Sequence, residues 1–309
     1  MRLLVVINPS ARDFEAERRW PAMEARLRRV ASVTVVSTAP DDAETSRRIR
    51  AALSDRPERV VAIGGDGTVH LVLNAVMSEP GAPPELAVIP FGTANNVAKS
   101  LGLPLDDFDA LADVAVGAKL APLDVGRLEA RLGGTARSSW WLDSITVGMD
   151  ADVLEARAHH RGLGGYLAYA AALAERAIEQ QSLDVRVTLD GRVIDTRVFN
   201  MIINNVPLYA GELRLPGSRG DDGLLDVYLF NRREYASKLL SFAIKQTDWL
   251  QLGLHELLED LTENQREHHA RTVHLRLASP RHVQVDGEVY GEADELRAEV
   301  TGQLRFAVP

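Results

Sequence analysis

The chain contains no cysteine among its 309 residues. This absence excludes disulfide bonds, thiolate catalysis and metal sites ligated by cysteine. A chain without cysteine also suits a reducing compartment, so we expect a cytoplasmic location.

Long apolar runs are missing too. The opening segment, MRLLVVINPS, has too few consecutive apolar residues for a secretory signal and predicts a first strand. A membrane-spanning helix needs about 18 consecutive apolar residues. The richest segment, residues 166–174, is followed directly by Glu175 and Arg176. The sequence therefore predicts no membrane-spanning role.

Positive charge is in short supply. The 35 Lys and Arg residues are outnumbered by 44 Asp and Glu residues, which leaves a net charge of −9. Because affinity for nucleic acid depends on clustered positive charge, this balance argues against a nucleic-acid partner.

The length of the chain and the order of its apolar segments predict two domains. In residues 1–122, apolar strands alternate with helices, which is typical of a parallel sheet covered on both faces. The predicted strands are residues 2–7, 32–38, 60–63 and 86–90. The predicted helices are residues 14–31 and 41–53, a helix ending at residue 77, and residues 95–101.

Residues 123–309 predict a mainly antiparallel β domain with helical insertions, in which the last strand could return to the first domain. Alternating segments predict hairpins around Asp190-Gly191, Asp286-Gly287 and Thr301-Gly302. Further strands are expected at 198–205 and 224–230, and a helix at 234–267. We expect the functional site in the cleft between the two domains.

Three loops of small polar residues follow strands of the first domain, at residues 8–10, 64–68 and 90–95. Ligands of such sheets bind at the carboxyl ends of the strands. In GGDGT, residues 64–68, glycines allow backbone N–H groups to approach an anion at a helix N-terminus. The pattern is neither a P-loop nor a dinucleotide fingerprint.

Each loop also has a plainer interpretation. GGDGT could be a tight strand-to-helix turn, and residues 90–96 could be a turn with an asparagine cap. Asp66 favours the phosphate interpretation, because a carboxylate beside phosphate repels it unless a divalent cation lies between them. Two such loops on neighbouring strands support each other.

Several motifs, in order along the chain, resemble the diacylglycerol kinase catalytic family. They are GGDGT (64–68), VIPFGTANNVAKSLG (88–102), LDVG (123–126), DDGLLDV (221–227) and VDGE (285–288). The family includes bacterial lipid kinases and the sphingosine and ceramide kinases, and it shares its nucleotide fold with NAD kinases. The resemblance covers Asn8 to Glu288. It implies an NAD kinase-like α/β domain followed by a β-rich domain that receives the lipid.

The resemblance implies transfer of a phosphoryl group from ATP, with Mg²⁺, to the hydroxyl of a diacylglycerol-like, monoacylglycerol-like or sphingoid lipid. It makes Glu288 the catalytic base, and it makes Asp66 a catalytic acidic residue that organises Mg²⁺ together with Asp124. A second, structural metal site is implied at the carboxylate of Asp222 and the carbonyls of Arg219 and Leu224. The implied nucleotide contacts are Asn8, Thr38, Gly64, Gly65, Asp66, Gly67, Thr68, Val69, His70, Gly92, Thr93 and Asn95.

Plainer interpretations remain open for single residues. Glu288 could be an exposed strand residue, Asp222 part of a simple turn, and Asp124 the start of a strand. Lys99 could reach phosphate or lie in solvent. The pairs His159-His160 and His268-His269 are expected at the surface of helices, without zinc-ligand spacing.

The sequence departs from the family pattern at two positions. Ala11 stands where the family commonly has glycine. Asn96 replaces the aspartate of Gly-Thr-x-Asn-Asp and so removes a negative charge. The alternatives are therefore a kinase for a soluble metabolite such as NAD, or a catalytically weak protein that binds nucleotide or lipid.

A lipid substrate implies contact with a membrane surface. Because an acidic chain is poorly suited to an anionic surface, we expect that contact to be transient. The Arg18-Arg19 and Arg28-Arg29 region is the candidate basic patch. The oligomeric state is left open, with a homodimer among the alternatives.

Overall fold

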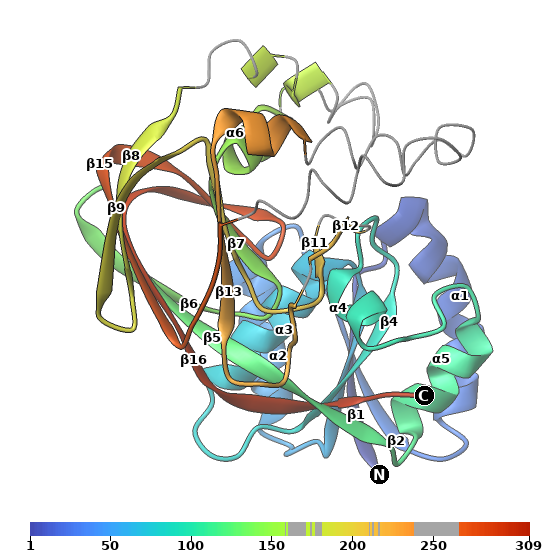
Figure 1. The fold of residues 1–309 in the computed structure, drawn as a ribbon. Helices are drawn as coiled ribbons and strands as arrows, with labels where there is room; N and C mark the ends of the chain where they lie inside the picture. The colour runs from blue at the N-terminus through green and yellow to red at the C-terminus, as the bar shows by residue number, and fades with distance from the viewer. Residues whose placement is uncertain are drawn as a thin grey trace.

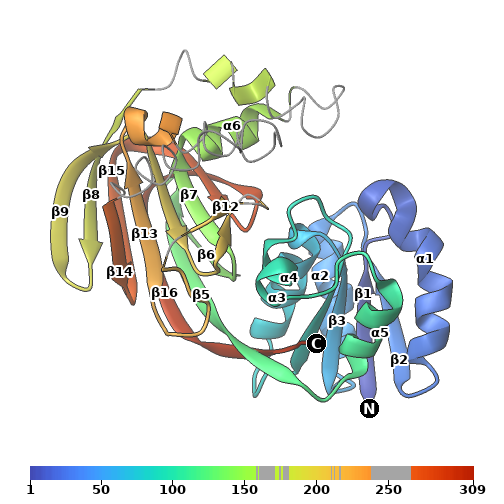
Figure 2. The same cartoon turned by 45° about the vertical axis from the view of Figure 1, so that its right-hand side comes forward.

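The structure is a computed structural model with an α/β lobe and a β-rich lobe (Figures 1 and 2). This confirms the predicted fold class. The structure describes residues 1–157, 159, 171–173, 175–176, 181–209, 211, 213–215, 217–237 and 266–309. Among them, no helix is long and apolar enough to cross a membrane.

The first lobe alternates strands and helices as the sequence predicts. Its elements are β1 (Arg2–Ile7), α1 (Ala11–Leu27), β2 (Ser32–Ser37), α2 (Asp42–Leu53), β3 (Arg59–Gly64), α3 (Asp66–Met77), β4 (Glu85–Pro90), α4 (Asn96–Ser100) and α5 (Phe108–Val116). The four strands pair in parallel in the order β4-β3-β1-β2.

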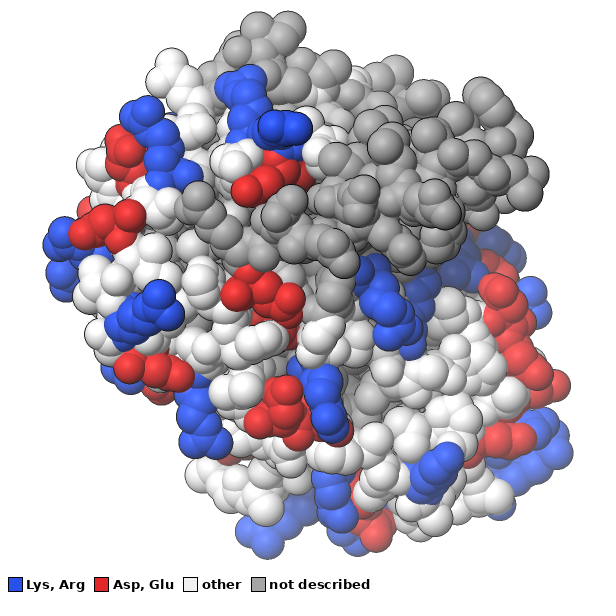
Figure 3. Space-filling view, viewed as in Figure 1, with Lys and Arg blue, Asp and Glu red and all other residues white. Residues whose placement is uncertain are grey.

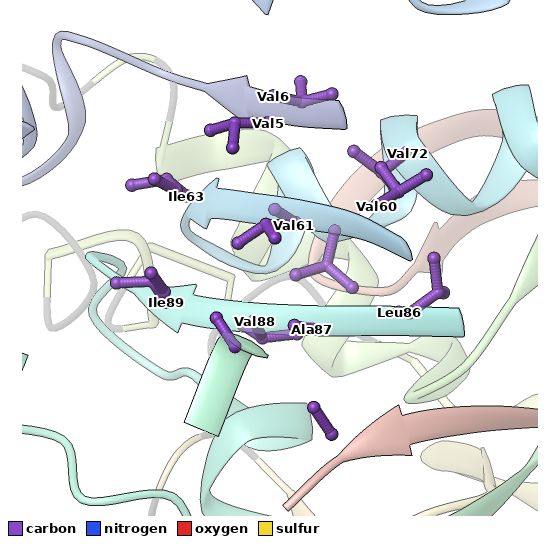
Figure 4. Close-up of a cluster of buried hydrophobic side chains, with 14 of the residues drawn as sticks. Val5, Val6, Val60, Val61, Ile63, Val72, Leu86, Ala87, Val88 and Ile89 are labelled. Carbon is purple, nitrogen blue, oxygen red and sulfur yellow. The ribbon is translucent and has the colours of Figure 1, made fainter. Parts of the chain in front are cut away.

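The core of this lobe explains the unbroken apolar runs. All six residues of β3 are buried, because helices cover the sheet on both faces. Aliphatic side chains from β1, β3, β4 and α3 meet at its centre, as Figure 4 shows for Val5, Val6, Val60, Val61, Ile63, Val72, Leu86, Ala87, Val88 and Ile89.

The second lobe is built mainly from antiparallel strands. They are β5 (Leu120–Leu132), β6 (Thr135–Trp141), β7 (Ser144–Gly148), β8 (Leu183–Leu189), β9 (Arg192–Val198), β10 (Asn200–Asn204), β11 (Leu208–Tyr209), β12 (Leu213–Arg214), β13 (Leu225–Phe230), β14 (Arg266–Ala270), β15 (Thr272–Val285) and β16 (Glu288–Ala307), with helix α6 (Met149–Arg157) after β7. Their main order is β14-β13-β10-β7-β15-β16.

The last strand connects the two lobes. Near its end, β16 pairs in parallel with β4 through Phe306 and Leu86, and along most of its length it pairs with β5. Figure 2 shows β5 and β16 running together from the β-rich lobe into the α/β lobe. The final strand therefore returns to the first lobe, and one hydrogen-bonded sheet continues through both.

Two predicted hairpins are confirmed and a third is wrong. β8–β9 turn at Asp190-Gly191 and β15–β16 at Asp286-Gly287, and each turn residue has the positive φ that such two-residue turns require. At Thr301-Gly302 there is no turn. β16 continues past both residues with a register shift against β5, and the Thr301 hydroxyl donates to the Val125 carbonyl at 3.1 Å. The alternation of apolar and polar residues continues on both sides of Thr301-Gly302, so these two residues form a bulge within one long strand.

The helix predicted at 234–267 lies largely outside the described residues. Residues 232–237 are helical, but Arg266–Ala270 form strand β14. His268 and His269 are therefore on a strand, and the helical prediction for them is wrong. Pairing of β14 with β13 decides this, because an edge strand gains its hydrogen bonds from a distant partner rather than from local propensity.

Candidate active site

The glycine loops after β3 and β4 lie directly against each other. Gly64 pairs with Pro90 at the carboxyl ends of these strands. A Cβ atom added to Gly92 would lie 2.7 Å from the Cα atom of Gly65, and one on Gly64 would collide with the Thr68 side chain. Bare backbone is thus required for the two loops to approach, which supports the prediction that they act together.

Asn95 holds the second loop and joins it to the first. Its side-chain oxygen accepts from the N–H of Gly92, and its side-chain nitrogen donates to the Gly92 carbonyl, each at 2.8 Å. Its own N–H donates to Oδ2 of Asp66 at 2.8 Å. Asn95 has a left-handed φ of 52°, which asparagine tolerates better than most residues. It therefore organises the loop that the sequence assigned to the nucleotide.

Asp66 begins α3 as a carboxylate in a poorly solvated position. Burial raises its pKa to about 6, the hydrogen bond from Asn95 opposes that rise, and the nearby charge of Asp286 adds to it. In the part of the chain that the structure describes, no Lys or Arg side chain forms an ion pair with Asp66. Such a carboxylate fits a divalent cation, whose charge would favour its ionised form.

The other predicted nucleotide residues line the same edge of the sheet. Asn8 donates its N–H to the Ile63 carbonyl at 2.9 Å, and Thr38 donates to the Ile7 carbonyl at 2.8 Å. Thr68 and Val69 are both buried, Val69 within the apolar core of the lobe, and the N–H of each donates to the Gly65 carbonyl. Thr93 is exposed at the loop tip.

Glu288 approaches this edge from the second lobe. It follows the Asp286-Gly287 turn, and its Oε1 would lie 2.6 Å from a Cβ atom added to Gly67 in the first turn of α3. Glu288 is an exposed residue at the start of β16, as the plainer interpretation expects. Protein atoms around its carboxyl group nevertheless raise its pKa, while the nearby charge of His70 opposes that rise. The turn between two distant strands thus brings the predicted base beside the glycine loop.

Buried Asp286 fixes this turn. Its carboxylate accepts from the N–H of Asp143 at 2.8 Å and of Leu142 at 3.2 Å, and its Oδ2 lies 2.8 Å from Nδ1 of His70. The other ring nitrogen of His70 contacts Asn74 at 3.2 Å. His70, assigned to the nucleotide from the sequence, therefore holds the turn that carries Glu288.

Asp124 lies in a different set of contacts. It is fully buried, its carboxylate accepts from the N–H of Gly223 at 2.7 Å and from Gln303 at 2.9 Å, and its N–H donates to the Gly220 carbonyl. It thus packs against the loop 219–224. Its role beside Asp66 at Mg²⁺ stays a prediction.

The loop 219–224 holds the three residues assigned to the second metal. Oδ1 of Asp222 accepts from the N–H of Leu224 at 3.0 Å, and Arg219 donates to Asp221 at 3.1 Å. Beside this loop lies a cavity of about 550 Å³, lined in part by Lys119, Arg219 and Asp221. The Asp222 carboxylate shapes a turn here, and its metal role also stays a prediction.

Lys99 and two of the predicted surface histidines have defined neighbours. His159 is exposed and lies 3.9 Å from Glu155, whereas His160 lies outside the described residues. Lys99 donates to the Gly211 carbonyl at 2.7 Å instead of extending into solvent. His269 is half-exposed and lies 2.7 Å from Asp226 and 3.7 Å from Glu267. These three side chains are close enough to hold a metal ion, a grouping that the sequence did not predict because β13 and β14 are distant in the chain.

Sequence reasoning also missed Asp143, which precedes β7. Its side chain is 2% exposed and accepts from Nδ2 of Asn96 at 2.7 Å. Burial raises its pKa well above the ordinary value, and the charges of Asp66 and Asp286 add to that rise. The only signal in the sequence was one acidic residue inside the apolar run WWLDSITV, since buried acids need a specific reason.

Comparison with known proteins identifies relatives for both lobes. Residues 2–128 match the model of the diacylglycerol kinase catalytic domain. Residues 143–307 match the model described as the YegS C-terminal NAD kinase beta sandwich-like domain.

Curated relatives include the diacylglycerol kinase of Staphylococcus carnosus (strain TM300), 24% identical over 237 residues, or 76% of this chain and 74% of the relative. The diacylglycerol kinase of Staphylococcus aureus (strain MRSA252) is 23% identical over 236 residues, or 76% and 72%. The crystal structure of a diacylglycerol kinase from Bacillus anthracis str. Sterne matches with a TM-score of 0.74 at 20% identity, covering 100% of this chain and 97% of that chain. This last likeness supports the fold of both lobes.

Proposed function

Since this chain belongs to the diacylglycerol kinase family and is a lipid kinase, we propose that it transfers the γ-phosphate of ATP, with Mg²⁺, to the hydroxyl of a diacylglycerol-like or sphingoid lipid. The observation that carries the proposal is the approach of Glu288 to Gly67. It puts a carboxylate from one lobe beside the glycine loop of the other.

The proposed roles follow from the chemistry of phosphoryl transfer, which needs positioning, neutralised phosphate charge and a base. Backbone N–H groups of the loops around Gly65 and Gly92 would contact the phosphates of ATP. Asp66 would hold Mg²⁺, which when bound offsets the phosphate charge. Its donor set fits, because its carboxylate is poorly solvated and has no cationic partner among the described side chains.

Glu288 would accept the proton of the lipid hydroxyl. The hydroxyl oxygen forms a bond to the γ-phosphorus while the bond from that phosphorus to the β–γ bridging oxygen breaks, and ADP leaves. Crowding by protein atoms raises the pKa of Glu288, which makes its carboxylate a stronger base than an ordinary glutamate. His70 and Asp286 would keep the turn that carries Glu288 in place.

Transfer of labelled phosphate from ATP tests the proposal. Wild type and Glu288→Gln are offered Mg²⁺ with mixed micelles of several lipid alcohols and, separately, NAD. Glu292→Gln, an exposed glutamate on the same strand, is the matched control. We expect lipid labelling that falls at least about 100-fold in Glu288→Gln alone, since a general base contributes about that much.

The other outcomes separate the alternatives. Labelling of NAD rather than lipid would show a kinase for a soluble metabolite. Binding of ATP with no transfer to any acceptor would show a nucleotide-binding protein with little catalysis. Equal labelling by Glu288→Gln and wild type would remove Glu288 from its proposed role.

We also propose transient contact with a membrane surface, which a lipid acceptor requires. In Figure 3, basic and acidic side chains alternate over the described part of the visible face. The arginines that the sequence suggested as a patch have acidic neighbours, Arg19 with Glu15 at 3.3 Å and Arg28 with Glu24 at 2.7 Å. We therefore expect weak binding to anionic vesicles, and sedimentation that changes little when these arginines become alanine. A large loss of vesicle binding in that variant would show that these arginines do form a membrane-binding patch.

A further inference from the structure

Position 96 departs from the family pattern, and its side chain is hydrogen-bonded to a carboxylate of the other lobe. Asn96 stands where the family has aspartate, and its side chain is 4% exposed. Its Oδ1 accepts from the N–H of Gly211 at 2.7 Å and its Nδ2 donates to Oδ2 of Asp143 at 2.7 Å. The amide is therefore held at both ends, and one of its partners is a carboxylate from the other lobe.

One oxygen of Asp143 is left without a partner. Asp143 is 2% exposed, and its Oδ1 is buried with no hydrogen-bond partner among the described residues. A buried carboxylate oxygen is costly unless it meets a donor or a cation. Asp66 and Asp286 are close enough to repel the negative charge of Asp143. Asp286 is already matched by His70 and by backbone N–H groups, whereas Asp143 has only the amide of Asn96.

We propose that Asp143 supplies the acidic group that position 96 lacks, and that it acts with Asp66 to hold the Mg²⁺ of the bound nucleotide. This rests on the proposed function. Asn96 then positions the carboxylate of Asp143 through its hydrogen bond. The site then retains one carboxylate across the pair, at position 143 instead of position 96.

The exchange is chemically conservative. Asparagine and aspartate have nearly the same shape, and the bond between them runs from amide to carboxylate whichever residue carries the charge. The N–H of Gly211 can donate to a carboxylate at position 96 as it does to the amide. The double variant Asn96→Asp/Asp143→Asn therefore preserves the net charge, the side-chain volume and the hydrogen bond.

The test measures the affinity for Mg²⁺ by calorimetry in the presence of a non-hydrolysable ATP analogue, without any lipid. We expect Asp143→Asn to weaken Mg²⁺ binding roughly 10- to 100-fold, as is typical when a residue supporting a metal site is lost. The double variant should recover most of that loss. Phosphate transfer should follow the same order. Asp152→Asn, an acid of α6 paired with His282, is the control and should bind Mg²⁺ as wild type does.

The outcomes distinguish this inference from the proposed function. Wild-type Mg²⁺ affinity in Asp143→Asn would overturn the inference and leave the kinase proposal standing. A double variant as weak as Asp143→Asn would also overturn it, because a structural acid is not rescued by moving its charge. Should Asp143→Asn fail to fold, the Mg²⁺ affinity of the folded double variant tests the inference alone. An affinity close to that of wild type supports the inference, and a large loss overturns it. Absence of Mg²⁺–nucleotide binding in wild type would contradict the proposed function itself.

Discussion

Nδ1 of His70 lies 2.8 Å from Oδ2 of Asp286, so the first turns of α3 are hydrogen-bonded to the β15–β16 turn. His70 belongs to the α/β lobe and Asp286 to the β-rich lobe. The contact therefore fixes the position of Glu288, two residues beyond Asp286, against the loop that is proposed to hold the nucleotide.

Loss of this contact should reduce turnover through Glu288. We expect His70→Gln to lower kcat roughly 10- to 100-fold with a smaller change in the KM for ATP. The reason is that Glu288 would no longer be held in position to accept the proton of the lipid hydroxyl. The double variant His70→Gln/Glu288→Gln should be no slower than Glu288→Gln alone, since both changes act on one step. If the fold-decrease in kcat of the double variant equals the product of the two single decreases, His70 acts independently of Glu288.

The pH dependence of kcat should reflect the raised pKa of Glu288. Protonation removes the base, and a raised pKa means that protonation occurs at a higher pH than for an ordinary glutamate. Activity should therefore be full above that raised pKa and fall as the pH decreases through it. Measuring kcat at saturating ATP and Mg²⁺ separates this step from the titration of free Asp66. An acid limb that persists unchanged in the residual activity of Glu288→Gln would contradict the assignment.

Replacing Asp66 should stabilise the metal-free protein. Folding raises the pKa of Asp66 from 3.8 to about 6, so above pH 6 the folded state carries a charge that burial disfavours. This cost disappears as the pH falls below 3.8, where the group is protonated in both states. We expect Asp66→Asn to raise the free energy of unfolding by up to about 3 kcal/mol at pH 8 and by less at pH 5. Phosphate transfer should be lost.

Chemical denaturation at the two pH values checks this prediction. Asp55→Asn, at an exposed loop position, is the matched control and should show no pH-dependent gain. An Asp66→Asn variant less stable than wild type at pH 8 would mean that the carboxylate contributes to folding rather than to ligand binding.

The contact between the glycine loops predicts a steric effect. In Gly92→Ala the new methyl group would lie 2.7 Å from the Gly65 Cα atom and 2.6 Å from Oδ1 of Asn95, so backbone must move. We expect a loss of about 1–3 kcal/mol in unfolding free energy and a KM for ATP raised at least about 10-fold. Gly302→Ala, which meets no atom within 4 Å, should change neither quantity appreciably. Equal changes in unfolding free energy and KM at the two positions would contradict the steric argument that the loop requires glycine at position 92.

Much of the local architecture could be predicted from the sequence because it depends on neighbours in the chain. The buried strands β1, β3 and β4 appear as unbroken apolar runs, and glycine with asparagine marks the loops at their ends. Asp286-Gly287 specifies its turn through positive φ angles. These features follow from side-chain period and backbone sterics, which act over a few residues.

Only the tertiary structure decided which distant groups meet. It made Thr301-Gly302 a bulge in β16 rather than a turn, because β5 continues alongside. It placed Asp124 against the loop 219–224, and it joined Asn96 to Asp143 across the lobes. Charge and hydrogen-bond pairing act through space, so residues separated by dozens of positions come into contact without leaving a local pattern in the sequence. The sequence by itself determined that phosphate and a cation are expected at this edge of the sheet, whereas the fold decided which carboxylates lie there.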